Sequence, residues 1–170
     1  MKMDKVTQKL REGLDAAVSL AQEKRHQQIE PEHLDLALLR QEDSVVVQTL
    51  DELGVSSFNV IKAVEAAIDS FTQVAGNNTR AYFSNRMNKV LNDAEQESHR
   101  LHDEFISVEH ILLAEFSDPE SAFIRELNKQ NISKDAVLKA LANIRGSQRV
   151  TDENPEAKYK PLEKYGRDLT

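Results

Sequence analysis

The sequence predicts an all-α protein, and three observations support this fold class. Of its 170 residues only five are Gly, four are Pro and 5% are aromatic, whereas sheets need more turn residues and favour aromatic and β-branched side chains. Apolar residues recur at three- and four-residue spacing, first at Val6, Leu10 and Leu14, which is typical of a helix with one buried face. The same arrangement of residues then returns 77 positions later.

The repeat is clearest in two matching stretches, 29–39 (IEPEHLDLALL) and 106–116 (ISVEHILLAEF). Each stretch is expected to form the central helix of a four-helix repeat and to be buried, because it is apolar nearly all round. A four-helix repeat of this kind has one side that it cannot bury alone. We therefore expect the two repeats to pack pseudo-symmetrically into one globular domain with a common core.

Polar residues mark where the other helices begin and end. Thr7 and Ser84, at equivalent positions, precede the first helix of each repeat, and hydroxyl side chains favour such N-terminal positions. Gly54 and Asn131 are also equivalent, and these two residue types tolerate the left-handed backbone that ends many helices. The repeats are expected to span about residues 4–75 and 81–146. Residues 147–170 contain few apolar side chains and are interpreted as a linker that leads to a module absent from this chain.

Composition limits the partners of the protein. The formal net charge is −7, which argues against nucleic acid or an anionic membrane as the main partner, since phosphates attract Lys and Arg. The chain has no Cys and thus no disulfide or thiolate chemistry. No signal peptide and no apolar stretch of membrane-spanning length is visible. A cytoplasmic location is the expectation.

The sequence offers little for catalysis. No glycine-rich phosphate loop is present, and we expect no nucleotide hydrolysis, no cofactor and no metal in this chain. The adjacent pairs Glu32-His33 and Glu109-His110 point in different directions on a helix, so structural roles at the helix start are favoured over a metal site.

One alternative involves other histidines. His99 and His102 are three residues apart and precede Asp103, and together they form a candidate site for a divalent cation.

The doubled pattern resembles the Clp N-terminal repeat domain at the front of Clp-type AAA+ unfoldases. The resemblance covers residues 4 to about 146 and is carried by Thr7, the two stretches 29–39 and 106–116, Gly54 and Ser84. The end of the chain, from Leu162 to Thr170 (LEKYGRDLT), is similar to the segment that leads into the first ATPase module of ClpB-type disaggregases.

This resemblance implies a function. A domain of this kind recognises unfolded or aggregated polypeptide and delivers it to the ATPase ring, where the threading occurs. The chain itself is expected to be no enzyme and to be monomeric. The resemblance further implies that the full-length protein is a hexameric ATPase using ATP and Mg, and that it works with a DnaK-type chaperone system. The alternative is an adaptor-docking domain of a protease-linked Clp unfoldase, which would bind a folded partner.

The resemblance also implies a site. Polar residues at the positions of Thr7, Asp103 and Glu109 are associated with substrate handling in this family. Three family positions that are apolar in a ClpB groove carry Asp93, Glu97 and His110 here. The predicted substrate-binding residues are Thr7, Leu10, Leu14, Val90, Asp103, Glu109, His110 and Ile111, of which Leu10, Leu14, Val90 and Ile111 are expected to supply an apolar wall.

Overall fold

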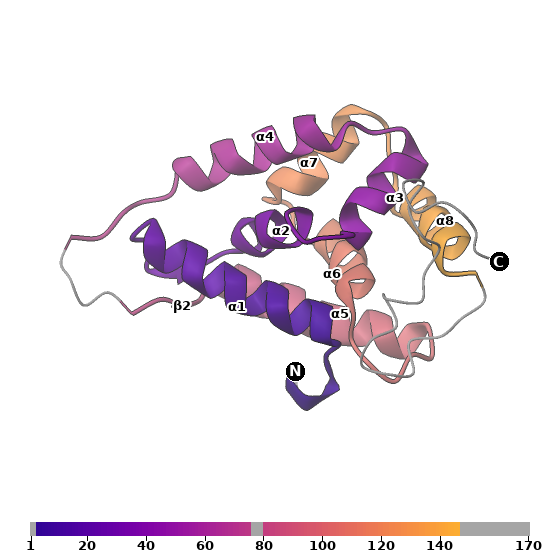
Figure 1. Cartoon of the computed structure of the whole chain (residues 1–170), viewed down its shortest axis with the longest axis horizontal. Helices are drawn as coiled ribbons and strands as arrows, with labels where there is room; N and C mark the ends of the chain where they lie inside the picture. The colour runs from indigo at the N-terminus through magenta and orange to yellow at the C-terminus, as the bar shows by residue number, and fades with distance from the viewer. Residues whose placement is uncertain (1–2, 76–79, 147–170) are drawn as a thin grey trace.

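The structure, a computed structural model, describes residues 3–75 and 80–146 and contains eight α-helices in these residues (Figure 1). The predicted linker at 147–170 lies outside the described residues. Repeat one contains the short 3-10 helix η1 (Met3–Lys5), α1 (Gln8–Glu23), β1 (Gln28–Ile29), α2 (Pro31–Leu39), α3 (Val45–Leu53) and α4 (Ser57–Asp69). Repeat two contains β2 (Tyr82–Phe83), α5 (Asn85–Arg100), α6 (Val108–Ala114), the 3-10 helix η2 (Glu115–Ser117), α7 (Ala122–Lys129) and α8 (Lys134–Arg145).

The helix ends follow the repeat as the sequence predicts. The hydroxyl groups of Thr7 and Ser84 accept the N–H groups of Leu10 and Met87, respectively, and thereby cap α1 and α5. Gly54 ends α3 with φ of 73°, and its counterpart Asn131 has φ of 60°. Both lie in the left-handed region, so the predicted caps are confirmed.

The two repeats interleave rather than stack as separate units. The fourth helix of each repeat packs against the third helix of the other, so that α4 contacts α7 and α8 contacts α3 (Figure 1). Short parallel pairings relate the repeats in the same way: β1 pairs with β2, and Val6 pairs with Ile106 in the equivalent place. Helices from both repeats supply one hydrophobic core. The all-α fold with two pseudo-symmetric repeats is therefore confirmed.

The central helices are the most deeply buried elements. Every residue of α2 is buried, including Glu32, His33 and Asp35, and every residue of α6 is buried, including Glu109 and His110. The prediction of buried central helices is confirmed. Charged and titratable side chains of α2 and α6 therefore lie inside the domain, where each needs a hydrogen-bond or ionic partner.

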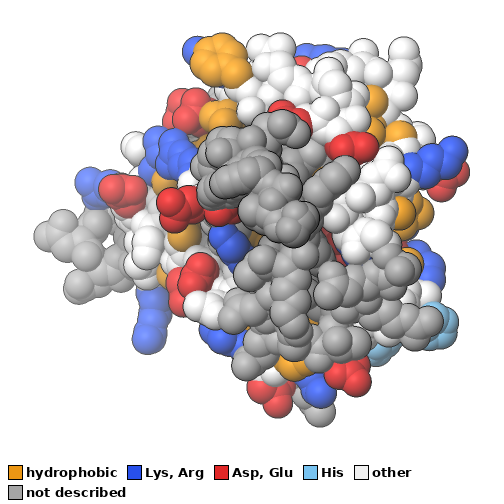
Figure 2. Space-filling view, turned by 45° about the vertical axis from the view of Figure 1, so that its right-hand side comes forward, with side chains coloured by type: hydrophobic (Ala, Val, Ile, Leu, Met, Phe, Trp, Pro, Cys, Tyr) orange, Lys and Arg blue, Asp and Glu red, His pale blue; other side chains and the backbone are white. Residues whose placement is uncertain are grey.

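The surface is strongly polar. Figure 2 shows charged side chains of both signs interspersed on one face, with hydrophobic side chains in small separate groups outside the grey atoms. In the described residues the exposed large hydrophobic side chains are Met3, Phe58 and Tyr82, which belong to three different elements. Among the described helices, none combines the length and the apolar character that crossing a membrane requires.

Candidate functional site

The apolar residues predicted to form a groove wall lie in the core. Leu10, Leu14, Val90 and Ile111 are each at most 2% exposed. A wall that contacts substrate must be reachable from solvent, and in this structure Leu10, Leu14 and Ile111 pack in the core, so their role in substrate binding stays a prediction. Val90 borders a small surface pocket of about 120 Å³ beside α5 and η2.

Thr7 has a structural role that the sequence also predicts. Its Oγ1 accepts the N–H of Leu10 at 3.3 Å, and its own N–H donates to the carbonyl of Ile106 at 2.9 Å. The side chain is fully buried. These bonds tie the start of α1 to the residue before Ser107, where α6 begins. An effect of Thr7 on substrate handling, which stays a prediction, would have to act through this junction.

Asp103, Glu109, His110 and Arg145 form a buried group that we call the Arg145 cluster. His110 Nδ1 accepts the N–H of Ser107 at 2.8 Å, so the ring proton sits on Nε2, which donates to Asp103 Oδ2 at 2.8 Å. Arg145 donates from Nη1 to Glu109 Oε1 at 2.5 Å and from Nη2 to Asp103 Oδ1. The predicted structural role of His110 at the helix start is confirmed. Asp103 and Glu109 join the end of α8 to the start of α6.

In the Arg145 cluster the charged groups are Arg145, Asp103 and Glu109, while His110 is neutral. Burial lowers the pKa of His110, and the hydrogen bond and charge of Asp103 oppose that shift. The neutral ring that the hydrogen bonds require is therefore also the favoured form near neutral pH. One guanidinium then pairs with two carboxylates, each of which is nearly fully buried, so one negative charge is left in excess.

The same cluster is the described group whose ligand atoms could surround a cation. Atoms of Asp103, Glu109 and His110 lie within 4.8 Å of one another. Both carboxylates already hold the Arg145 guanidinium, so a metal ion would have to displace it. The alternative site at His99, His102 and Asp103 is not assembled, because the two histidines are exposed whereas Asp103 is buried and directed at His110.

Repeat one has a different pair at the equivalent positions. His26 stands where repeat two has Asp103, and its Nδ1 lies 2.9 Å from His33 Nε2. His33 Nδ1 accepts the N–H of Glu30 at 2.8 Å, as the predicted structural role requires. The ring of Phe71 packs against both imidazoles. Burial, followed by the charge of His26, lowers the pKa of His33 to about 4. Repeat one therefore holds a neutral pair where repeat two holds ions.

A second buried ionic group was not predicted from the sequence. We call it the Arg86 cluster, and its members are Glu30, Glu32, Arg86 and Asp118. Arg86 Nη2 lies 2.8 Å from Asp118 and 3.0 Å from Glu32, and Nη1 lies 3.6 Å from Glu30. Glu32 Oε2 also accepts the N–H of Ala122 at 3.0 Å, at the start of α7. Glu32 therefore stabilises a helix start of the other repeat in addition to lying in its own first turn.

Two further carboxyl groups lie beside the Arg86 cluster. Asp35 and Glu115 are almost completely buried. Burial raises the pKa of Asp35, and the negative charge of Glu115 raises it further. Burial likewise raises the pKa of Glu115 to about 7, with Ser121 donating to its Oε1 at 3.1 Å. A shared proton is the physical solution, because two carboxylates in this environment cannot both remain charged. In the sequence, the position of Asp35 within the apolar stretch of α2 was the signal that could have indicated a buried carboxyl group.

The charged residues at the expected groove are tied to neighbours. Asp93 accepts a hydrogen bond from Lys89 at 2.7 Å. Glu97 is buried and accepts hydrogen bonds from Arg100 at 2.7 Å and Lys134 at 2.6 Å. These ion pairs lie on the α5 side where an apolar groove was expected, and the pocket that remains there beside Val90 holds only about 120 Å³.

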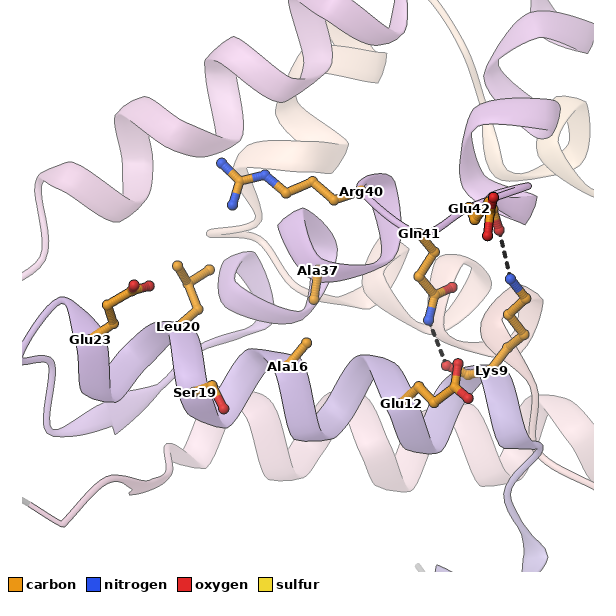
Figure 3. A pocket seen from close by; sticks show the side chains of 10 residues that line it. All are labelled: Lys9, Glu12, Ala16, Ser19, Leu20, Glu23, Ala37, Arg40, Gln41 and Glu42. Carbon is orange, nitrogen blue, oxygen red and sulfur yellow. Dashed lines mark hydrogen bonds between the residues drawn. The ribbon is translucent and has the colours of Figure 1, made fainter.

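An open groove of about 640 Å³ lies on the other repeat, between α1 and α2 (Figure 3). Ala16 of α1 and Ala37 of α2 face each other across it, and Leu20 points into it (Figure 3). At one end Lys9 Nζ donates to the carbonyl of Glu42 at 2.6 Å. We call this feature the α1–α2 groove and define it by Lys9, Glu12, Ala16, Leu20, Ala37 and Glu42. Sequence reasoning missed it, since an Ala on each of two helices carries no distinctive pattern.

These features define a class: a double-repeat helical domain with internal ion pairs and open surface grooves. The chain belongs to the family described as the Clp repeat (R) N-terminal domain, whose model matches residues 5–130. It is 37% identical over 165 residues to the chaperone protein ClpB of Bdellovibrio bacteriovorus, covering 97% of this chain and 19% of that protein. The chain thus spans about a fifth of the length of this relative.

Solved structures share the fold. The N-terminal domain of Hsp104 from Candida albicans superposes with a TM-score of 0.78 at 18% identity, covering 89% of this chain and 98% of that domain. A ClpV N-domain solved as a complex with a VipB peptide superposes with a TM-score of 0.60 at 23% identity, covering 82% of this chain and 86% of that chain.

Proposed function

We propose that this chain is the substrate-recognition domain of an ATP-dependent disaggregase, which binds unfolded or aggregated polypeptide and passes it to an ATPase ring. The observation that carries the proposal is its 37% identity to a ClpB chaperone along 97% of the chain. ATP and Mg binding, the hexamer and cooperation with a DnaK-type system belong to the full-length protein in this proposal.

The geometry is compatible with weak and reversible binding at the surface. The α1–α2 groove is open and has a partly apolar floor at Leu20 and Ala37, which suits transient contact with an extended segment more than enclosure of a small molecule. Thr7, Asp103 and Glu109 would contribute from inside, by fixing the helix ends of repeat two and the start of α1. In this proposal a mutation of these residues alters binding through the position of the helices.

A second candidate function is the docking of one defined partner, as in an adaptor-docking domain. The observation that favours it is the similarity in fold to a ClpV N-domain that was solved with a VipB peptide. The two functions differ in selectivity: an adaptor-docking domain binds one particular folded partner, whereas a disaggregase domain accepts many unfolded polypeptides.

The test is an NMR titration of the isotope-labelled 170-residue chain with lysozyme that has been reduced and alkylated to a neutral form. Native lysozyme is the matched control, because its sequence and net charge are nearly the same. We expect shifts that cluster on one surface with the unfolded form and none with the native form. Equal shifts with both forms would mean non-specific charge attraction, and no shift with either would refute polypeptide recognition by this domain.

A further inference from the structure

The α1–α2 groove has a counterpart in repeat two, and the two differ greatly in size. The counterpart is the pocket beside Val90, with about 120 Å³ against about 640 Å³ in repeat one. The reason lies in the helix that forms one wall of each. Where α1 carries Glu12 and Ala16, α5 carries Lys89 and Asp93, which form an ion pair of 2.7 Å along the helix. The side chains of Lys89 and Asp93 therefore occupy space in the repeat-two pocket that is open in the α1–α2 groove of repeat one.

The rim of the α1–α2 groove carries unbalanced negative charge. It has three carboxylates but only two cations: Lys9, which donates to a neutral backbone carbonyl and keeps its charge, and Arg40, which pairs with Glu65 of α4 at 3.1 Å. Within the part of the chain that the structure describes, no cation pairs with the rim carboxylates. These exposed carboxylates belong to Glu12, Glu23 and Glu42.

The floor of the groove fixes the size of side chain that fits. Ala16 and Ala37 bring the two helix backbones within reach of an occupant, and Leu20 is partly exposed beside them (Figure 3). Small or medium apolar side chains can cover this floor, while longer basic side chains can reach the rim and keep their charge in water.

We infer that the α1–α2 groove of repeat one is the polypeptide-binding surface, and that it takes segments in which apolar side chains alternate with Lys or Arg. The occupant is an extended or helical stretch of another chain. This inference rests on the proposed function and adds the location of the site and the chemistry of the preferred segment.

An exchange of residues between the repeats tests the location. The variant Glu12→Lys/Ala16→Asp gives α1 the ion pair of α5, and Lys89→Glu/Asp93→Ala gives α5 the residues of α1. The first variant closes the groove at solvent-exposed positions, so we expect unchanged thermal unfolding and about tenfold weaker binding. The second leaves the α1–α2 groove intact and should bind within about twofold of the wild type. The readout is the dissociation constant of a peptide of alternating Leu, Ala and Lys residues.

The same peptide with Glu in place of Lys tests the chemistry, and we expect about tenfold weaker binding than with Lys. Equal affinity for the two peptides would overturn the charge preference. Unaltered binding by Glu12→Lys/Ala16→Asp, with shifts in α5 or α6, would overturn the location and leave polypeptide recognition intact. If neither peptide nor unfolded lysozyme shifts any resonance, the proposed function falls together with this inference.

Discussion

Replacement of Arg86 by Met is expected to destabilise the domain more than any surface change. The Arg86 side chain is 21% exposed, while those of Glu32 and Asp118 are 2% and 8% exposed. Removing the guanidinium leaves both carboxylates buried without their cation, beside Asp35 and Glu115. Breaking a buried ion pair in this way costs about 3–5 kcal/mol. We expect a loss of about 3 kcal/mol at pH 8, the lower end of that range, because the guanidinium is partly solvated.

The pH dependence gives this prediction its direction. Burial raises the pKa of Asp35 and the charge of Arg86 opposes that rise, so the folded variant holds protons to higher pH than the folded wild type does. The cost of the substitution relative to wild type therefore shrinks as pH falls from 8 to 5.5. Urea unfolding of the 170-residue chain at both pH values measures this directly.

The matched control for Arg86→Met is Lys89→Met on the same helix. Lys89 pairs with Asp93 at 2.7 Å, but the two side chains are 64% and 30% exposed. Such a pair contributes only about 0.3–0.5 kcal/mol. The reasoning is refuted if Arg86→Met costs no more than this control at pH 8, or if its cost is the same at pH 5.5. Adding Glu32→Gln to Arg86→Met should recover part of the loss, since it removes one of the stranded charges.

Three other changes have defined outcomes. The pKa of His33 is lowered to about 4, so between about pH 6.5 and 4 only the unfolded chain binds a proton at this residue. The free energy of unfolding should therefore fall by on the order of 3 kcal/mol as pH decreases through this window. Urea unfolding of His33→Gln should show a weaker dependence on pH. In Gly13→Ala the added methyl would lie 2.5 Å from Leu38 Cδ2, and overpacking of about 1–3 kcal/mol should outweigh a helix-propensity gain of about 1 kcal/mol, which thermal unfolding would report as a lower Tm. Arg145→Gln removes the cation beside Asp103 and should speed amide hydrogen exchange in the last turn of α8; unchanged exchange there would contradict the role of the Arg145 cluster.

The helix ends could be predicted from the sequence because their causes are local. A hydroxyl group at Thr7 or Ser84 reaches an N–H three residues away, and Gly54 needs no neighbour to adopt a left-handed backbone. The 77-residue offset then transferred each assignment to the other repeat. The same applies to His33 and His110, whose hydrogen bonds to backbone N–H groups span three residues.

The site could not be predicted in the same way because burial depends on how the repeats interleave. An apolar stripe such as Leu10 and Leu14 looks the same whether it lines a groove or fills a core, and here it fills the core. Arg86 reaches Glu32 across 54 positions of sequence, and no local pattern indicates such a pair. Asp35 in an apolar helix was the one visible sign that charges would be buried.

The differences between the repeats also indicate where the protein keeps surface available for a partner. Position 97, the counterpart of Leu20, is a buried Glu held by Lys134, whereas Leu20 borders an open groove. Position 93, the counterpart of Ala16, is an Asp held by Lys89. Both carboxylates in repeat two are held in ion pairs, the buried one of Glu97 and the partly exposed one of Asp93, whereas the equivalent positions in repeat one are small or apolar.

A carboxylate that is bonded to Lys must lose that bond and be desolvated before an apolar segment can cover it. An ion pair and an apolar binding contact therefore exclude each other at the same position. Repeat one makes no such demand at Ala16 and Leu20. A peptide therefore meets the lower cost of binding at α1, although the family resemblance directs attention to α5. This ordering of costs, more than the volume of either groove, is the physical basis for expecting recognition at repeat one.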